Sequence, residues 1–375
     1  MKNERNNLIC QPGDRIKSWN NKKSCFMMSE VTSIRNRNGK MEYYVIFENM
    51  DLCFGEWATE DQLDSKSVVK LKKSSSSIIN DEMRVQLELE EYLGRTRNIE
   101  YLYLGEYRIK AWYFSPVPEP YCNNECLYCC EYCMRFFISF EDLHSHISRC
   151  TTLHPPGNEI YRKGNISVYE VDGSMSQRWC SNLCLITKLF LHHKTEYYDP
   201  TPFMFYVLCM NDLRGARPIG YFSKETDIEC FNNLSCILAF PPYHRSGVGR
   251  CLIQFSYELS KIEKRPGGPE RPLSDLGQLA YLSFWKSAII HCLIVHQGQQ
   301  ISIQQISQFT GMIESDIKET IQKEKILQQT DRDWVWRLTP KKIAEWKSKE
   351  SKKRLRIDPK LIQWIPPNRL KKKSV

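Results

Sequence analysis

One stretch of the sequence, from Leu234 to Tyr257, predicts a strand, a turn and a helix in succession. Its first part, Leu234 to Phe240, is almost entirely apolar, which is typical of a strand buried on both faces. Pro241 and Pro242 end this strand, because proline cannot donate a hydrogen bond to a neighbouring strand. Apolar residues then recur at helical spacing from Cys251 to Tyr257. The stretch therefore restricts the chain to folds in which a buried strand leads through a short turn into a helix.

The turn itself, His244 to Arg250, predicts a phosphate-binding site. At a helix N-terminus, free backbone N–H groups and the positive end of the helix dipole favour anions. Arg245 and Arg250 add fixed charges, while Gly247 and Gly249 let the backbone approach a diphosphate closely. The turn lacks the third glycine of a dinucleotide fingerprint and the Gly-Lys-Ser/Thr of a P-loop. An ordinary turn with two spaced glycines is the alternative.

The net charge is +9, from 53 Lys and Arg against 44 Asp and Glu, and the basic excess lies late in the chain. These basic residues fit a solvated surface, or contact with nucleic acid or an acidic partner. They are Lys347, Lys349, Lys352, Lys353, Arg354, Arg356, Arg369 and Lys371 to Lys373. The polar start predicts no secretory signal, and the apolar run Ala288 to Val295 is too short to cross a bilayer. We therefore expect no membrane association.

Sixteen cysteines without a predicted export signal indicate reduced thiols and a metal site. The spacing Cys130-x2-Cys133-x12-His146-x3-Cys150 predicts a small zinc finger, with two ligands on a hairpin and two on one face of a helix. The interval of 12 residues favours this ligand set. We expect the zinc to be structural, and DNA reading by the finger is the less favoured role. Nearby residues compete as ligands, namely Cys122, Cys126, Cys129 and His144.

Residues from about Gln11 to Asp64 predict a small β-rich unit. Glu42 to Phe47 has the composition of a strand, and Asn36 to Gly39 before it predicts a hairpin turn. The aromatic residues of the unit fit either a cage for methylated lysine or the core of a small barrel, and the core is favoured. They are Tyr43, Tyr44, Phe47, Phe54 and Trp57. Leu71 to Ser77, which is rich in serine, predicts a linker.

Strand and helix patterns alternate in the middle of the chain and predict a mixed α/β core, over Ile166 to Val171, Leu183 to Leu191 and Pro202 to Cys209. Further on, Ile301 to Gly311 and Glu314 to Gln322 predict two helices joined by a glycine turn. Trp334 to Leu338 predicts a strand after them. Two helices and a following strand form a helix-turn-helix with a wing, which in isolation predicts DNA binding.

The motif Cys-Ile-Leu-x-x-Pro-Pro-Tyr-x-Arg-x-Gly-x-Gly, which begins at Cys236, closely resembles the acetyl-coenzyme A binding motif of MYST-family histone acetyltransferases. The resemblance continues through Pro269-Glu-Arg-Pro-Leu-Ser-Asp-Leu-Gly277 and extends from about Arg95 to Pro367. It implies an α/β (α+β) acetyltransferase core with a GNAT-like central coenzyme-binding motif, an embedded zinc finger and a C-terminal winged-helix-like segment. The first unit resembles the chromo-barrel (Tudor-knot) domain, a small N-terminal β-barrel found in one branch of the family.

The resemblance implies a division of the chain into three parts. The chromo-barrel covers residues 8–67, a linker covers 68–91 and the MYST-type acetyltransferase domain covers 92–370. Within that domain we expect the zinc finger at 128–152, the acetyl-CoA core at 160–285 and the winged-helix-like segment at 286–340.

The implied reaction transfers an acetyl group from a thioester to a lysine amine. Only a neutral amine attacks, and with a pKa near 10.4 on the order of one lysine in a thousand is neutral at pH 7. A positioned carboxylate that takes the proton is therefore required. Glu270 matches the catalytic glutamate of the family, and Cys236 matches a cysteine of its active site. We favour direct attack by the amine, with Cys236 lining the site, over a covalent acetyl intermediate on its thiol.

By resemblance, the cosubstrate acetyl-CoA contacts three groups of residues. Ile237, Leu238 and Ala239 meet its acetyl and pantetheine end, and Ser274 and Ser283 match further coenzyme contacts. The pyrophosphate is held by His244, Arg245, Ser246, Gly247, Val248, Gly249 and Arg250. Lys194 matches the lysine that is autoacetylated in the family, and an ordinary surface lysine is the alternative.

The coenzyme motif departs from the family pattern at three positions. Where His244 stands the family usually has Gln or Arg, Val248 replaces a residue that is often aromatic, and Arg250 replaces a common Lys. Because histidine titrates near neutrality, His244 predicts a coenzyme affinity that depends on pH.

The sequence therefore predicts a nuclear histone acetyltransferase that acts on histone H4 tails and nucleosomes in chromatin regulation and transcription. The implied branch works within a multisubunit acetyltransferase complex, and the basic C-terminal tail suits nucleic acid. Two alternatives remain. One is an acetyltransferase of mainly non-histone proteins, and the other is a zinc-finger and winged-helix DNA-binding regulator, which would not explain the coenzyme motif.

Overall fold

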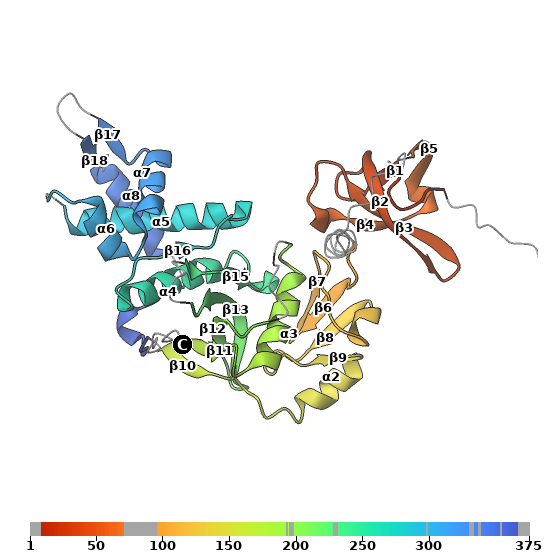
Figure 1. Ribbon diagram of the computed structural model, residues 1–375, viewed down its shortest axis with the longest axis horizontal. Coiled ribbons are helices and arrows are strands. Elements are labelled where there is room, and N and C mark those ends of the chain that lie inside the picture. Colours follow the sequence, from red (N-terminus) through yellow and green to blue (C-terminus); the bar gives the residue numbers. More distant parts are fainter. Residues whose placement is uncertain are drawn as a thin grey trace, which may run out of the picture. The chain divides into compact units, whose positions relative to one another are not determined.

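A computed structural model describes residues 9–70, 96–192, 194, 199–227, 232–297, 299–329, 334–336, 339–352 and 355–366 (Figure 1). The chain divides into two compact units, which we describe separately. The first comprises Met1–Cys130, Phe136–His146 and Asn182–Tyr197, and the second comprises Glu131–Arg135, Ile147–Ser181 and Tyr198–Val375. Most of the predicted linker 68–91 lies outside the described residues. So do several residues of the basic tail, namely Lys353, Arg354, Arg369 and Lys371 to Lys373.

The first unit begins with a five-stranded antiparallel sheet in the order β4-β3-β2-β1-β5. The strands are β1 (Arg15–Asn20), β2 (Cys25–Arg37), β3 (Lys40–Phe47), β4 (Glu56–Thr59) and β5 (Leu63–Val69). The short helices η1 (Leu52–Phe54) and η2 (Glu60–Gln62) flank β4. The predicted hairpin is confirmed, since Asn38 and Gly39 have φ values of 54° and 80° between β2 and β3. The sheet extends to Val69, slightly beyond the predicted end of the domain at residue 67.

The aromatic residues of this sheet serve mainly as its core. Tyr43, Tyr44 and Phe47 are almost completely buried. Phe54 is partly exposed beneath the ammonium of Lys22, and Trp57 lies under the guanidinium of Arg35. Three of the five aromatic rings are therefore closed to an external ligand, which supports the core interpretation over a complete methyl-lysine cage.

A second sheet of the first unit has the order β7-β6-β8-β9. Its strands are β6 (Tyr101–Leu104), β7 (Tyr107–Lys110), β8 (Cys126–Cys129) and β9 (Phe136–Phe137). The short helix η3 (Tyr121–Asn123) precedes β8, and helix α2 (Phe140–Ile147) follows β9. Helix α3 (Gln177–Lys188) confirms the predicted helix but begins and ends earlier than expected.

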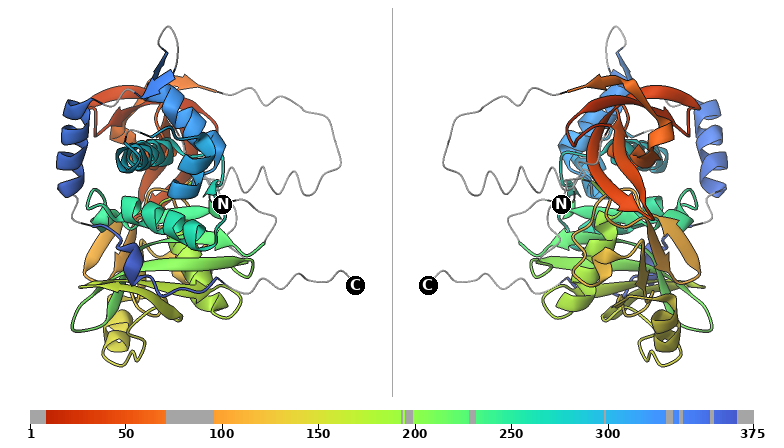
Figure 2. Two further views of the ribbon diagram at one scale, coloured as in Figure 1. Left: turned by 90° about the vertical axis from the view of Figure 1, so that its left-hand side faces the viewer. Right: turned by 90° about the vertical axis from the view of Figure 1, so that its right-hand side faces the viewer.

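The second unit is built on the antiparallel sheet β10-β11-β12-β13-β15, with helix α4 (Val248–Ile262) lying along one face (Figures 1 and 2). Its strands are β10 (Asn158–Lys163), β11 (Ile166–Asp172), β12 (Phe203–Asn211), β13 (Ala216–Glu225) and β15 (Cys236–Ala239). Val248, Leu252 and Phe255 of α4 pack into the same core as Val168, Leu208 and Phe222 of the sheet. The predicted mixed core is thus confirmed in α+β form, because every pairing in this sheet is antiparallel.

The predicted strand Leu234 to Phe240 is divided in two, and the expectation that both its faces are buried is wrong. β14 (Asn232–Leu234) pairs in parallel with β16 (Gly268–Pro269), whereas β15 pairs with β13. β15 is the last strand of its sheet, and Leu238 is buried while Cys236, Ile237 and Ala239 are half-buried. The apolar run reflects an edge strand that is only partly buried, not the interior of a parallel sheet.

Helices and a two-stranded sheet follow. They are α5 (Asp275–Val295), α6 (Ile303–Thr310), α7 (Glu314–Lys323), β17 (Leu327–Gln329), β18 (Trp334–Trp336) and α8 (Pro340–Ser351). The two predicted helices and the predicted strand are confirmed as α6, α7 and β18. The expected boundary between residues 285 and 286, however, falls inside α5, because this one helix packs on both α4 and the α6–α7 pair.

α5 is also longer than its apolar C-terminal run suggested. Among the described residues it is the one helix that passes a test of length and composition for crossing a membrane. The buried helix of a folded core passes the same test, and Tyr281, Trp285 and Ile289 of α5 pack with α4, α6 and α7.

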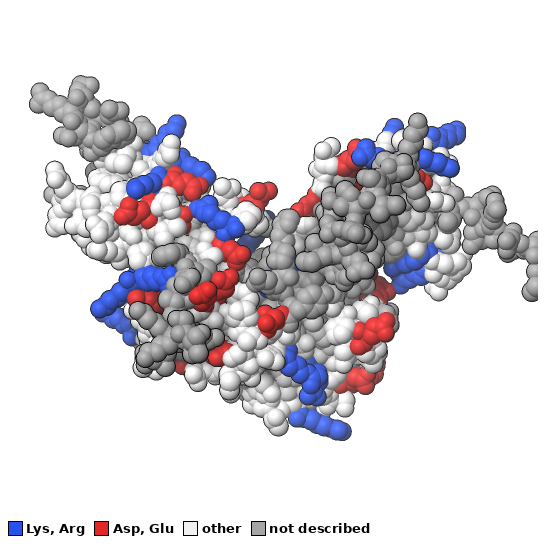
Figure 3. Space-filling view, in the orientation of Figure 1, with Lys and Arg blue, Asp and Glu red and all other residues white. Residues whose placement is uncertain are grey.

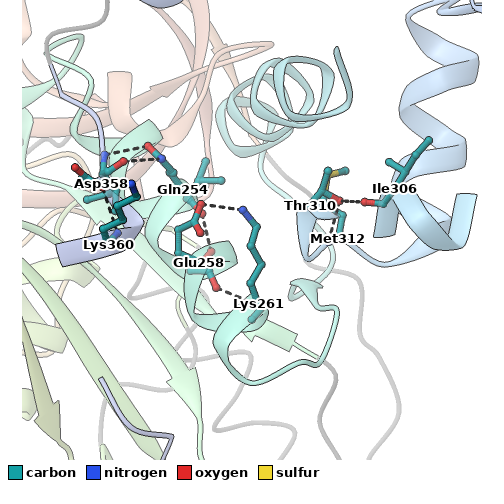
Figure 4. Close-up of polar contacts among 12 residues, drawn as sticks. Gln254, Glu258, Lys261, Ile306, Thr310, Met312, Asp358 and Lys360 are labelled. Carbon is teal, nitrogen blue, oxygen red and sulfur yellow. Dashed lines mark hydrogen bonds and ion pairs between the residues drawn. The ribbon is translucent and has the colours of Figure 1, made fainter. Parts of the chain in front are cut away.

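The last described residues, 355–366, return to the main sheet and include the short helix η5 (Pro359–Leu361). Gln254 of α4 exchanges two hydrogen bonds of 3.2 Å with the backbone of Ile357, just before Asp358 (Figure 4). Ile362 forms a bridge with Tyr161, and the Trp364 indole donates to Glu170. The segment therefore covers the core formed by α4 and the sheet.

Candidate active site

Cys236 and Glu270 lie on neighbouring backbone segments although 34 positions separate them in the sequence. Cys236 begins β15, and its Sγ is 3.8 Å from the hydroxyl of Tyr221 on β13. Glu270 follows β16, and its backbone N–H donates to the carbonyl of Leu234 at 2.8 Å. Because Leu234 precedes Cys236 by only two residues, the β14–β16 pair brings the backbone of Glu270, an exposed residue, close to the start of β15, where Cys236 lies.

The loop that carries Glu270 is also fixed on its other side, by the turn between α6 and α7. Gly267 donates to the carbonyl of Gly311 at 2.9 Å and accepts from Ile313. Gly268 has no room for a side chain, since an added Cβ would lie 2.7 Å from a carboxylate oxygen of Asp316. The loop is thus held between β14 and the α6–α7 turn.

The turn His244 to Arg250 has the geometry of an anion site at a helix N-terminus. Gly247 is the N-cap of α4 with a φ of 97°, and as a glycine it has no side chain that could cap the helix. The first backbone N–H groups of a helix have no partner within it, and the first turn of α4 holds no acidic residue. An added Cβ at Gly249 would meet nothing within 4 Å, so a ligand can approach the backbone there. The donors therefore fit the diphosphate of acetyl-CoA.

Residues of this turn divide into an exposed group and a packed group. His244, Arg245 and Ser246 are exposed. A ring nitrogen of His244 lies 2.8 Å from the carbonyl of Ala239, and the Ser246 hydroxyl donates to the Tyr243 carbonyl. Val248, in contrast, is buried in the core below the turn.

Arg250, in the first turn of α4, has a charged partner within the protein. Its guanidinium is 3.4 Å from the carboxylate of Glu350 on α8 and 5.4 Å from the ring of Phe284 on α5. Burial lowers the pKa of Arg250, and the charge of Glu350 opposes that effect. Its charge is thus already paired with a carboxylate of the protein, and the exposed Arg245 is better placed to meet a phosphate.

Two other expected coenzyme contacts lie on α5. Ser274 is its N-cap, and its hydroxyl accepts from the N–H of Gly277 at 3.1 Å. Ser283 is exposed further along the same helix. Ile237, Leu238 and Ala239 lie on β15, which has no second strand partner within the described part of the chain, so backbone groups on that edge suit an extended ligand.

Lys194 is half-buried after the end of α3. It belongs to the first compact unit, and residues 193 and 195–198 around it lie outside the described residues. Autoacetylation of Lys194 stays a prediction.

The metal-ligand set is confirmed as a spatial cluster. One ligand atom from each of Cys130, Cys133, His146 and Cys150 lies within 4.8 Å of all the others. Cys130 and Cys133 occupy the turn between β8 and β9, and His146 lies on α2, as expected. Cys150, however, follows the end of α2, so the expectation of one shared helical face is wrong. The competing residues Cys122, Cys126, Cys129 and His144 lie outside the cluster.

The donor set of this cluster fits zinc. Three thiolates and one imidazole at about 2.0–2.3 Å from a tetrahedral ion would lie close together, as these atoms do. Between the ligands, the carbonyl of Tyr132 accepts a hydrogen bond of 2.8 Å from the Trp179 indole, which ties the ligand turn to α3. With four protein ligands the ion would have no open position, as in structural rather than catalytic sites.

Sequence reasoning missed Arg271 and Asp316, which lie beside the Glu270 loop. The Arg271 guanidinium is 2.7 Å from the carboxylate of Asp316, whose side chain is 1% exposed. The sequence could have pointed to Asp316. Its position follows the helical spacing of the buried face of α7, which also holds Ile317, Thr320 and Ile321. A charged residue within such a face needs a partner.

Comparisons with known proteins identify the family of this chain and several relatives. The MOZ/SAS family matches residues 154–362, and the MYST family zinc finger domain matches residues 96–150. The chain is 44% identical over 277 residues to "Histone acetyltransferase esa1" of Emericella nidulans, covering 73% of this chain and 54% of that protein. It is 39% identical over 326 residues to "Histone acetyltransferase Tip60 homolog" of Caenorhabditis elegans, covering 84% and 71%. It is 46% identical over 264 residues to "Histone acetyltransferase KAT6A" of Homo sapiens, covering 70% and 13%. The chain thus matches about half the length of the fungal relative.

Proposed function

Because this chain belongs to the MOZ/SAS family and carries the zinc finger of MYST proteins, we propose that it is a histone lysine acetyltransferase. It transfers acetyl from acetyl-CoA to lysine amines of histone tails. The observation that supports this most strongly is the backbone bond from Glu270 to Leu234, which brings the backbone of Glu270 close to the edge strand that carries Cys236. The uncapped N-terminus of α4, which suits the coenzyme diphosphate, follows the same strand.

In this proposal Glu270 is the general base. It takes a proton from the lysine ammonium, because only the neutral amine attacks the thioester carbonyl. A bond forms between the lysine nitrogen and the carbonyl carbon, and the carbon–sulfur bond breaks. The leaving thiolate takes up the second proton that the nitrogen loses, so coenzyme A is released as the thiol. Arg245, Ser246 and the first N–H groups of α4 hold the diphosphate, and the edge of β15 lies along the pantetheine.

Cys236 lines the site in this proposal and carries no acetyl group. It lies at the start of β15, half-buried and close to Tyr221. We expect mass spectrometry after mixing with acetyl-CoA alone to show no stoichiometric acetyl-thioester on Cys236, and Cys236→Ser to keep substantial activity. A trapped adduct that is absent in Cys236→Ser would instead establish the covalent route.

We further propose that the N-terminal sheet is a chromo-barrel domain, which would place the protein in the branch that acetylates histone H4. The five-stranded sheet and its aromatic core support this assignment. Histone tails and nucleosomes as substrates, a multisubunit complex and a nuclear location follow from the same branch.

The DNA-binding alternative finds less support in the charges of α7, the second helix of the helix-turn-helix. That helix carries three acidic residues and two lysines, and both lysines pair with glutamates one turn away. Lys and Arg alternate with Asp and Glu over this part of the surface (Figure 3). Phosphate binding calls for a basic face, so α7 is poorly suited to the major groove.

The test is acetyl transfer from labelled acetyl-CoA to matched peptides from the H4 tail, the H3 tail and a lysine-rich non-histone protein. We expect the H4 peptide to have the highest kcat/KM. Equal values for all three would favour the non-histone alternative, whereas coenzyme binding without any transfer would contradict the proposed reaction.

A further inference from the structure

Glu270 follows a loop whose position depends on the helix-turn-helix as well as on the sheet. On the sheet side the N–H of Glu270 donates to Leu234, and on the other side Gly267 bonds to Gly311 and Ile313. These two attachments fix the backbone before Glu270. What fixes the backbone after it is the side chain of Arg271.

Arg271 leads from the loop to α7 and contacts two carboxylates there. Its guanidinium is 2.7 Å from Asp316 and 3.2 Å from Glu319, and its own side chain is 47% exposed. Asp316 is almost completely buried, and burial raises its pKa while the charge and hydrogen bond of Arg271 lower it. A buried carboxylate is costly to leave unpaired, so Arg271 is strongly held in this position.

α7 is in turn held firmly against the core of the second unit. Gly311, with a φ of 77°, ends α6, and an added Cβ there would lie 3.0 Å from the backbone carbonyl of Tyr257 on α4. The Thr310 hydroxyl bonds to the carbonyl of Ile306 and accepts from the N–H of Met312, as Figure 4 shows. The α6–α7 turn is therefore a rigid support and can transmit its position to the loop.

Resting on the proposed role of Glu270, we propose that Arg271 and Asp316 are positioning residues, which hold the base in place by linking its loop to α7. Neither residue touches the reacting groups in this assignment. Glu319 assists as the second, more exposed partner of Arg271. The helix-turn-helix then has a role in catalysis, since it supports the loop of the base from the side opposite to β14.

A cycle of variants of the full-length chain tests this assignment. Arg271→Gln and Asp316→Asn should each lower kcat about tenfold, because small displacements of a catalytic group are costly. The KM for acetyl-CoA, coenzyme binding by calorimetry and zinc content should stay within about twofold of the wild type. The double variant should be no slower than the slower single variant, since both changes break one link. Arg271→Lys keeps the charge and should retain activity within about threefold.

Glu314→Gln is the matched control, because Glu314 lies on the same helix and pairs with Lys318 rather than with Arg271. It should behave as the wild type. Additive losses in the double variant, or losses that appear in KM rather than kcat, would overturn the assignment. A failure of the proposed function itself would look different, because Glu270→Gln would then transfer acetyl as fast as the wild type.

Discussion

At the scale of single residues, the coenzyme motif predicts the local backbone of the site but not the distant partners of its side chains. The coenzyme motif correctly indicated an exposed turn at the start of a helix, and Gly247 has the positive φ that such a turn needs. It did not indicate where Arg250 points, because its partner Glu350 lies on α8, 100 residues later. The helical pattern around Asp316 indicates that this buried charge needs a partner, but not that Arg271, 45 residues earlier, supplies it. Side-chain roles that depend on distant partners are not encoded in local patterns.

His244 leads to a prediction at this scale. Where the family usually has Gln or Arg, this chain has a histidine, and a positive charge on it would favour the coenzyme diphosphate. We expect calorimetry to show tighter binding of coenzyme A at pH 6 than at pH 8 in the wild type, and a flatter profile in His244→Gln. A ring nitrogen of His244 lies 2.8 Å from the carbonyl of Ala239, so the ring is held beside the end of β15. Identical profiles in the two proteins would contradict this role.

At the scale of elements, helices and strands with clear local patterns were predictable, while their pairing was not. α6, α7 and the hairpin between β2 and β3 follow from periodicity and turn residues. The split of one apolar run into β14 and β15 does not, because each half pairs with a different strand. That split brings the backbone of Glu270 to Leu234, two residues before Cys236. The motifs could identify these two candidate residues, whereas periodicity alone could not have shown that their segments are neighbours.

The zinc finger gives a prediction for one such element. Cys133→Ser removes one of the four clustered donors, and we expect it to lose bound metal and soluble yield, because ion binding contributes directly to folding. Cys126→Ser is the matched control, since Cys126 lies on β8 outside the cluster and should keep its zinc. The measurement is zinc per chain after gel filtration. A well-folded, zinc-replete Cys133→Ser would defeat the ligand assignment.

A second prediction at this scale concerns how Glu170 holds the C-terminal segment, residues 355–366, against the sheet. One carboxylate oxygen of Glu170 accepts from both the Trp364 indole at 2.6 Å and the Tyr206 hydroxyl at 3.1 Å. Glu170→Gln can keep both bonds, whereas Glu170→Ala leaves both donors without that partner and should cost about 1–3 kcal/mol of unfolding free energy at pH 7.

Acidification should separate the charge of Glu170 from its hydrogen bonds. Burial raises the pKa of Glu170, so its charged form destabilises the folded state at neutral pH. Glu170→Gln should therefore be at least as stable as the wild type at pH 7, and the difference should shrink as the pH falls through that raised pKa. Thermal unfolding of the three proteins against pH measures this. A Gln variant as unstable at pH 7 as the Ala variant would contradict the interpretation.

At the scale of the whole molecule, the order of the parts along the chain was largely predictable. Each part has its own local signature: a β-rich start, a spaced set of metal ligands, the coenzyme motif and two helices with a wing. Their boundaries were harder to predict, because single elements serve two parts at once. α5 crosses the expected boundary at residues 285 and 286, and its buried side chains belong to one core with those of α4, α6 and α7. The acetyltransferase core and the winged segment are therefore better regarded as one folded body.

The central claim, that the chain transfers acetyl to lysine with Glu270 as base, is tested most directly by single-turnover transfer. The preformed complex with labelled acetyl-CoA is mixed with an H4 tail peptide, using the wild type and Glu270→Gln. We expect rapid labelling by the wild type and a rate at least about 100-fold lower in the variant, while coenzyme binding and zinc content stay the same. Equal transfer rates in the two proteins would contradict the account.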